Sequence, residues 1–155
     1  MRVAYLSLGS NMGDRAALLS SAVKTLCEND PYRLSSVFET GPVGDVAQAA
    51  FWNLVMELST RASVRDLLER CRRAESDAQR VREVRWGPRT LDVDVLLVGD
   101  ERSEDPEILV PHPRMWQRRF VLAPLRELAP ELVTAEMFEA AQGSVLRIGT
   151  LDTLR

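Results

Sequence analysis

The segment LDVDVLLV, residues 91–98, limits the possible folds more than any other stretch of the chain. Side chains of a β-strand alternate between its two faces. One face would hold Leu91, Val93, Val95 and Leu97, and the other would hold Asp92, Asp94, Leu96 and Val98. Both faces are therefore apolar toward the end of the strand. We expect a strand that is covered on both sides there, with the two carboxylates at the rim of the covered face.

The spacing of Asp92 and Asp94 indicates a positively charged partner. Side chains two residues apart leave a strand by the same face, so the two carboxylates repel each other. Mg²⁺ suits such a pair, because it prefers oxygen ligands and takes most of them from water and substrate phosphates. A solvated strand end, or an ion pair with a nearby arginine, is the alternative interpretation.

The hydrophobic pattern of the chain predicts the element order βαββαβ. We expect strands near 3–8, 33–39, 52–59 and 91–98, and helices over 14–28 and 63–79. Ser63 and Asp66 are the candidates for a capping box at the start of the second helix. This order predicts an α+β fold with a ferredoxin-like core, in which an antiparallel sheet carries helices on one face. A helix from about Trp116 to Leu128, stopped by Pro130, and a tail without a clear pattern would be C-terminal additions.

Composition is that of an ordinary globular protein. The chain has 155 residues, enough for one domain over 1–155, and it is 45% apolar and 28% charged. A net charge of −3 gives no basic field for nucleic acid, and the apolar start is too short for a signal peptide or membrane anchor. We therefore expect a cytoplasmic protein without nucleic-acid or membrane partners. Cys27 and Cys71 fall at apolar helix positions, which predicts reduced, buried thiols.

The basic residues indicate how a phosphate ligand could be bound. Lys24 is the only lysine and has no P-loop sequence around it, so a nucleotide would be bound in another way. Four arginines precede the Asp92 strand: Arg80, Arg82, Arg85 and Arg89. They form either a solvated face or a clamp over anionic oxygens. A clamp beside an acidic pair is the combination that phosphoryl transfer requires.

Two other places could contribute to a site. His112, the only histidine, lies between prolines in PHP, where it is either structural or directed at a phosphate. Phe51 and Asn53 share a strand face. They are either core and turn residues, or an aromatic plate beside an amide that can donate and accept hydrogen bonds. The second interpretation predicts a pocket for a heterocycle.

Five segments together resemble the 6-hydroxymethyl-7,8-dihydropterin pyrophosphokinase family of folate biosynthesis. They are LSLGSNMGDR, ETGPVG, FWN, RVREVRWGPRTLDVDVLLVG and VPHPRMWQRRFVLAPLRELAP. The resemblance implies a ferredoxin-like α+β fold and transfer of the terminal diphosphate of ATP to the hydroxymethyl group of the pterin, leaving AMP. It also implies two Mg²⁺ ions and ATP as co-substrate. We expect the protein to be a monomer.

The resemblance further implies roles for particular residues. Asp92 and Asp94 would bridge both magnesium ions. The phosphate-handling arginines of a catalytic loop would be Arg80, Arg82 and Arg89. The nucleotide would contact Glu75, Arg89, His112 and Arg118. The pterin would lie between Phe51 and Phe120, near Thr40, Pro42, Val43, Asn53 and Trp86. The chain departs from the usual family sequence at Gly41, Gln79 and Trp116, none of which is an implied catalytic group.

Two rival functions follow from the same residues. A ferredoxin-like RNA-binding module is disfavoured by the acidic pair and the negative net charge. A different Mg²⁺-dependent nucleotidyl transferase could also use two aspartates on a strand. It would release pyrophosphate, whereas a pyrophosphokinase would release AMP.

Overall fold

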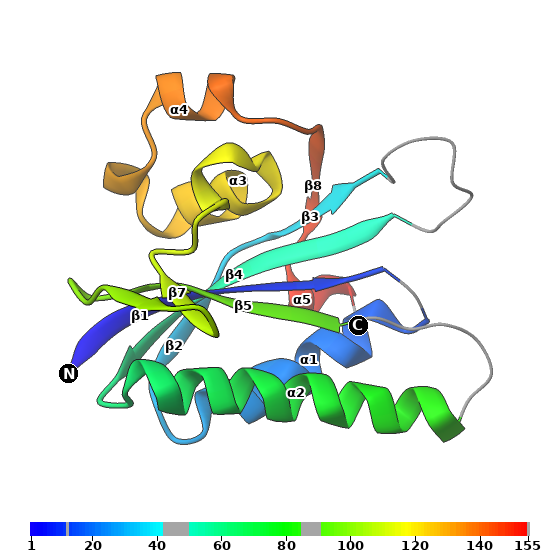
Figure 1. The fold of residues 1–155 in the computed structure, drawn as a ribbon. Helices are drawn as coiled ribbons and strands as arrows, with labels where there is room; N and C mark the ends of the chain where they lie inside the picture. The colour runs from blue at the N-terminus through cyan, green and yellow to red at the C-terminus, as the bar shows by residue number, and fades with distance from the viewer. Residues whose placement is uncertain (12, 42–49, 85–90, 155) are drawn as a thin grey trace.

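An antiparallel sheet of six strands forms the centre of the molecule (Figure 1). The computed structural model describes residues 1–11, 13–41, 50–84 and 91–154, and for 80–84 the backbone only. The strands are β1 (Arg2–Ser10), β2 (Tyr32–Leu34), β3 (Val37–Thr40), β4 (Phe51–Thr60), β5 (Leu91–Val98) and β8 (Val145–Gly149). Their order is β5-β1-β4-β3-β8, and β2 pairs with β4. The interior strand β1 therefore has β4 on one side and β5 on the other.

Helices cover both faces of this sheet. The helices α1 (Arg15–Cys27) and α2 (Val64–Val84) lie on one face, and α3 (Arg119–Leu128) and α4 (Ala135–Ala140) lie on the other (Figure 1). The predicted βαββαβ core is thus confirmed, with α1 and α2 as its two helices. The prediction that helices occupy one face holds for this core alone, because the C-terminal additions cover the opposite face. No described helix is both long and apolar enough to cross a membrane.

Strand alternation creates a separate hydrophobic cluster on each face. Leu6 and Leu8 of β1 and Leu54 of β4 are fully buried toward α1 and α2. On the other face, Val55 of β4 and Leu122 of α3 belong to one cluster and are both fully buried. A helix of the length of α3 extends about 15 Å, whereas a strand as long as β4 extends about 33 Å. The second cluster therefore covers only part of its face.

A cluster of paired polar side chains holds α3 over one end of that face. Arg33 donates to both carboxylate oxygens of Glu57, with distances of 2.8 and 2.8 Å, and reaches the carbonyl oxygen of Leu128 at 3.3 Å. The hydroxyl of Tyr5 donates to the same carboxylate at 3.1 Å. Burial, and then this bond to Glu57, raises the pKa of Tyr5 to about 12. These contacts join the end of α3 to β1, β2 and β4.

The predicted strand over 33–39 is two strands, β2 and β3. Ser35 interrupts them because its backbone N–H donates to Val55 O at 2.9 Å and its hydroxyl accepts from Val55 N at 2.9 Å. The hydroxyl also donates to the carbonyl of Ser36 at 2.8 Å. Serine side chains compete in this way with regular backbone pairing.

The strand over 91–98 is confirmed, but the predicted facing of its last two residues is wrong. Tyr5 pairs with Leu97 and Leu6 pairs with Val95, so Leu96 is an extra residue in β5. A β-bulge of this kind shifts the alternation by one position. Leu97 consequently packs toward α3 and Val98 toward α1 and α2.

Two helix boundaries differ from the prediction. The capping box is confirmed, since Ser63 Oγ accepts from Asp66 N at 3.0 Å and Asp66 Oδ2 accepts from Ser63 N at 3.4 Å. The helix that it starts continues to Val84, beyond the predicted end at Gln79, because no glycine or proline lies between Gln79 and Gly87. The predicted helix from Trp116 is instead the 3-10 turn η1 (Met115–Gln117) followed by α3. Arg118 separates them in an extended conformation, where it pairs with Gln142.

The rest of the chain after β5 contains elements that the hydrophobic pattern did not predict. They are β6 (Ser103–Asp105), β7 (Ile108–Val110), the 3-10 turn η2 (Pro130–Leu132), α4, β8 and α5 (Leu151–Leu154). The strands β6 and β7 form a hairpin, and β8 adds to the sheet at β3.

The predicted free thiols are confirmed, with one difference in burial. Cys71 is buried, and this burial raises the pKa of its thiol to about 12. Cys27 is only half-buried, because it is the last residue of α1.

Arg70 of α2 joins the two helices beneath the sheet. Its guanidinium group donates to Leu26 O at 3.0 Å and to Asp30 Oδ2 at 2.9 Å, and its side chain is only 9% exposed. Thr60 also donates to Asp30 Oδ2, at 2.6 Å. Burial alone would raise the pKa of Asp30, but these hydrogen bonds outweigh it and the pKa is lowered.

We predict that Arg70→Ala lowers the free energy of unfolding by about 2 kcal/mol, because it removes the charged partner of Asp30 and the side-chain donor to the Leu26 carbonyl. Arg73→Ala is the matched control, since Arg73 pairs with Glu28 at 2.8 Å but is 59% exposed. It should cost less than about 1 kcal/mol. Urea unfolding of both variants measures the difference, and equal losses would contradict the buried role of Arg70.

Candidate active site

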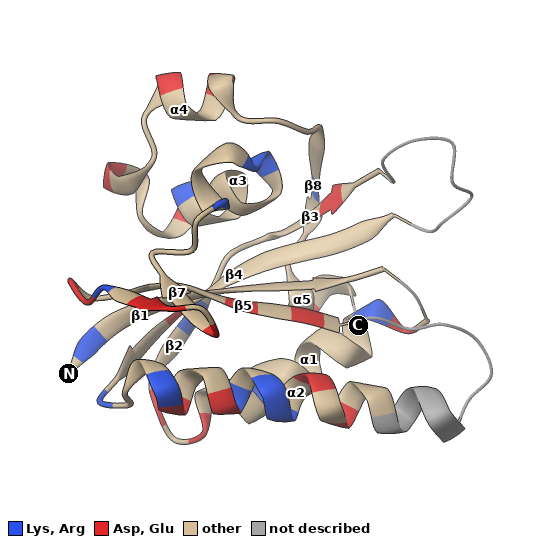
Figure 2. Ribbon diagram, viewed as in Figure 1, with Lys and Arg blue, Asp and Glu red and all other residues tan. Residues whose placement is uncertain are grey.

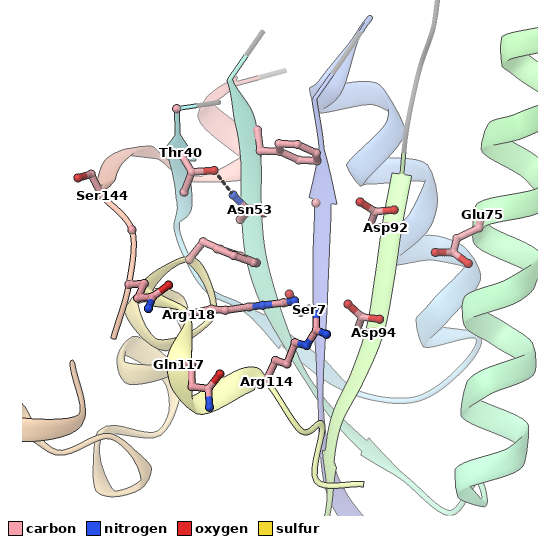
Figure 3. A pocket seen from close by; sticks show the side chains of 16 residues that line it. Ser7, Thr40, Asn53, Glu75, Asp92, Asp94, Arg114, Gln117, Arg118 and Ser144 are labelled. Carbon is pink, nitrogen blue, oxygen red and sulfur yellow. Dashed lines mark hydrogen bonds between the residues drawn. The ribbon is translucent and has the colours of Figure 1, made fainter. Parts of the chain in front are cut away.

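A pocket of about 1080 Å³ lies on the part of the sheet that α3 leaves open. Its floor is the end of β1 with the neighbouring parts of β4 and β5, and its sides come from β3, α2, the chain around η1 and the segment before β8 (Figure 3). It is lined by Ser7, Gly9, Thr40, Gly41, Phe51, Asn53, Glu75, Asp92, Asp94, Arg114, Gln117, Arg118, Phe120, Gln142, Gly143 and Ser144.

The acidic side of the pocket is positioned by the register of β5. Asp92 pairs with Gly9 and Asp94 pairs with Ser7, and all four residues line the pocket. Figure 2 shows acidic positions on β5 beside the uncharged ends of β1 and β4. Partial loss of hydration, and then repulsion from Asp94, raises the pKa of Asp92. The predicted pair of like charges on one strand face is therefore present.

Glu75 of α2 adds a third carboxylate on the outer side of β5 (Figure 3). Its Oε2 accepts a hydrogen bond from Val93 N at 3.0 Å, which occupies an amide on the open edge of the sheet. Burial raises the pKa of Glu75, and the charges of Asp92 and Asp94 raise it further. The whole side of the pocket is therefore electrically unfavourable to additional negative charge.

Asp92 and Asp94 fit a divalent cation that obtains its other ligands elsewhere. No three Asp, Glu, His or Cys side chains in the described part of the chain form a ligand cluster for a metal. Mg²⁺ does not need such a cluster, because it commonly uses one or two carboxylates together with water and substrate phosphates. The raised pKa of Asp92 agrees with a pair that a cation would stabilise.

His112 lies beside the acidic pair. Its Nδ1 accepts from Arg114 N at 3.2 Å, so the proton of the neutral ring is on Nε2. This Nε2 atom is 3.9 Å from Asp94 Oδ1. Burial lowers the pKa of His112, Asp94 opposes this change, and Arg118 and Arg114 reinforce it. The ring is therefore neutral at pH 7 and presents an N–H group toward Asp94.

The opposite end of the pocket is aromatic and amide-bearing. Asn53 is buried and its Nδ2 donates to Thr40 Oγ1 at 3.1 Å. The amide has further donor and acceptor capacity beyond this bond. Phe51 and Phe120 line the same pocket from β4 and α3, and the guanidinium carbon of Arg118 is 5.4 Å from the Phe120 ring centre. The predicted heterocycle residues that the structure describes therefore share one cavity.

Gly9 lies between the acidic end and the amide-bearing end of the pocket. A Cβ atom at this position would lie 2.8 Å from Asn53 Oδ1. That distance is well below van der Waals contact, so only glycine leaves Asn53 where it is. Ser7 and Gly9 were not predicted as site residues, although the alternation of β1 places them on one face with Asp92 and Asp94.

Other lining residues were also not predicted. Arg114 and Gln117 come from the segment PHPRMWQ, whose arginine gave a usable signal. Gln142, Gly143 and Ser144 come from the tail, where the sequence gave none. The backbone of Gln142 is held to the site by bonds to Gln117 O at 2.8 Å and from Arg119 N at 3.0 Å.

Seven predicted site residues are not among those that line this pocket. One is His112, which lies beside Asp94 without lining the cavity. Pro42, Val43, Trp86 and Arg89 lie outside the described residues, as do the side chains of Arg80 and Arg82. Their roles stay predictions.

We predict that His112 titrates with a midpoint below its ordinary value of 6.5. Asp94→Asn should lower the midpoint further, because the Asp94 charge favours the protonated ring. Since the folded state disfavours protonation, the stability contributed by the neutral ring is complete above pH 6.5 and is lost as the pH falls. Imidazole NMR signals of this single histidine measure both midpoints. A midpoint at or above 6.5 in the unmodified chain would be inconsistent with this environment.

Comparison with known proteins gives a consistent family. The model of the family described as 7,8-dihydro-6-hydroxymethylpterin-pyrophosphokinase matches residues 5–130. The chain is 45% identical over 133 residues to 2-amino-4-hydroxy-6-hydroxymethyldihydropteridine pyrophosphokinase of Bacillus subtilis, covering 84% of this chain and 80% of that protein. It is 43% identical to the protein of the same name from Methylorubrum extorquens, covering 86% of each. It is 36% identical to the Bifunctional protein FolKE of Lactococcus lactis, over 83% of this chain and 38% of that protein.

Proposed function

The chain belongs to the 7,8-dihydro-6-hydroxymethylpterin-pyrophosphokinase family, and we propose that it transfers the terminal diphosphate of ATP to the hydroxymethyl group of 6-hydroxymethyl-7,8-dihydropterin, leaving AMP. One observation supports this most directly: a single cavity holds both a carboxylate pair and an aromatic, amide-bearing end. The carboxylates suit a metal-bound polyphosphate, and the other end suits a flat heterocycle with hydrogen-bonding edges. Neither a polyphosphate alone nor a heterocycle alone would account for both ends of the cavity.

Asp92 and Asp94 are the proposed ligands of two Mg²⁺ ions. When bound, these ions would neutralise and orient the phosphate oxygens of ATP. Asp92 and Asp94 lie on one strand face with backbones fixed by β1, so the protein positions the pair before substrate arrives. His112 Nε2 lies 3.9 Å from Asp94 Oδ1, so its N–H group is available to a phosphate oxygen bound beside that carboxylate.

The pterin is proposed to bind between Phe51 and Phe120, with its edge on Asn53 and Thr40. A planar ring between two aromatic rings gains on the order of 1 to 3 kcal/mol from each, by analogy with stacked nucleobases. The bond from Asn53 to Thr40 fixes the plane of the amide, so its remaining groups point in defined directions. Pro42, Val43 and Trp86 are proposed to complete this end, on the basis of the family resemblance.

The nucleotide is proposed to contact Arg118, His112 and Glu75, together with Arg80, Arg82 and Arg89 on the basis of the family resemblance. Arg118, which lies between η1 and α3 in an extended conformation, lines the pocket. Its guanidinium group suits phosphate oxygens because its planar fork makes paired hydrogen bonds. Phosphoryl transfer depends mainly on such positioning and neutralisation, which these side chains would supply around the two substrates.

We predict that the purified chain, given ATP, Mg²⁺ and the hydroxymethyl dihydropterin, produces AMP in equal amounts to diphosphorylated pterin. Chromatography and ³¹P NMR identify the products. Asp94→Asn is the matched control and should lower turnover at least about a hundredfold, on the scale of losing one preorganised electrostatic group. Formation of ADP would contradict diphosphate transfer. Release of pyrophosphate would instead indicate the rival nucleotidyl transferase.

We predict that Gly9→Ala raises the dissociation constant of the pterin at least about tenfold, because the new methyl group displaces the buried amide of Asn53. Gly41→Ala is the control, since Gly41 lines the same pocket but a Cβ there has nothing within 4 Å. Isothermal titration measures pterin binding to both variants. Equal affinities would show that the Gly9 and Asn53 contact does not position the pterin.

A further inference from the structure

Arg114 lies in the same pocket, although neither the family resemblance nor the roles proposed above include it. It precedes η1, and its backbone N–H is held by His112 Nδ1 at 3.2 Å. This bond fixes the backbone of Arg114, whose side chain is exposed. Figure 3 shows the side chains of Arg114 and Arg118 extending toward the same part of β1, where Ser7 lies. Two guanidinium groups therefore enter the pocket opposite the acidic strand.

These two arginines differ from several others that the structure describes. Arg33, Arg65 and Arg72 each pair with a carboxylate at 2.8 to 3.1 Å. Among the side chains that the structure describes, no carboxylate lies within 4.0 Å of the Arg114 or Arg118 guanidinium group. Two like charges in one cavity repel, and an anion between them removes that repulsion.

The neighbouring Arg119 shows that not every arginine of this segment points into the pocket. Its guanidinium group donates to the carbonyl oxygens of Phe138 at 3.0 Å, Glu139 at 2.7 Å and Gly143 at 3.3 Å. These bonds hold the tail against α3. Arg119 is thus used within the fold, whereas Arg114 and Arg118 are directed into the cavity.

We infer that Arg114 is a phosphate-binding residue, which binds the polyphosphate of the nucleotide together with Arg118. This inference rests on the proposed function, which supplies ATP as the ligand. The position of Arg114 favours the nucleotide over the pterin, because it is near His112 and Asp94, whereas Asn53 and Thr40 are at the other end. An uncharged heterocycle would also leave both guanidinium charges uncompensated. Phosphate oxygens between the acidic strand and the two arginines would be bound from opposite sides.

The test compares Arg114→Gln with Arg102→Gln, which removes the same charge from an exposed turn between β5 and β6. The probe is α,β-methylene-ATP with Mg²⁺, which cannot be cleaved at the bond used in the reaction, and adenosine serves as the uncharged comparison. Isothermal titration measures both dissociation constants at low and high salt, and the pterin is measured alongside.

Arg114→Gln should weaken binding of α,β-methylene-ATP about tenfold, the loss expected for a hydrogen bond to a charged group. It should change binding of adenosine and of the pterin less than about twofold, and it should reduce the dependence of analogue affinity on salt. Arg114→Lys, which keeps the charge but not the fork, should give a smaller loss. Arg102→Gln should leave all these values unchanged.

Two results would overturn the inference: an equal loss for adenosine and the analogue, or a loss no larger than that of Arg102→Gln. Both are distinct from failure of the proposed function. If the unmodified chain did not bind the analogue, or made products other than AMP and diphosphorylated pterin, the proposed function itself would be wrong.

Discussion

The backbone register of β1 with its two neighbours determines the whole site. Gly9 pairs with Asn53 on one side and with Asp92 on the other, and Ser7 pairs with Asp94. The amide end and the acidic end are therefore separated by a single strand. Because neighbouring strands lie about 4.8 Å apart, this arrangement sets the distance between a bound heterocycle and a bound metal within narrow limits. A slip of one residue would turn Asp92 and Asp94 into the apolar core and destroy the site.

The pocket also keeps opposite charges from neutralising each other. Asp92 and Asp94 lie on its floor, while Arg114 and Arg118 enter from the chain around η1, beyond ion-pairing distance of any described carboxylate. A closer approach would give internal ion pairs, which would have to break before a substrate could bind. Because of this separation, the carboxylates still require a cation and the guanidinium groups still require an anion. A metal–polyphosphate complex provides the cation for the carboxylates and the anion for the guanidinium groups.

Local patterns predicted the core well, and long-range pairings account for most errors. The span of β5 and the capping box of α2 depend on neighbouring residues, so the sequence was sufficient for them. The bulge at Leu96 depends on the pairing with β1, and the break between β2 and β3 depends on Ser35 bonding to Val55. Asp92, Asp94, Phe51 and Asn53 could be identified because alternation places each pair on one face. Gln142 could not, since only its bonds to Gln117 and Arg119 bring it to the pocket.

The origin of the wall formed by Gln142, Gly143 and Ser144 bears on selective inhibition. The family match covers residues 5–130, so this wall comes from a part of the chain that the match does not include. The floor therefore lies within the residues that the family match covers, whereas the wall lies outside them. A compound confined to the floor would contact groups that family membership implies. A compound extended to Gln142 or Ser144 would also contact groups outside the matched residues, and selectivity over other family members would have to be built on contacts of that kind.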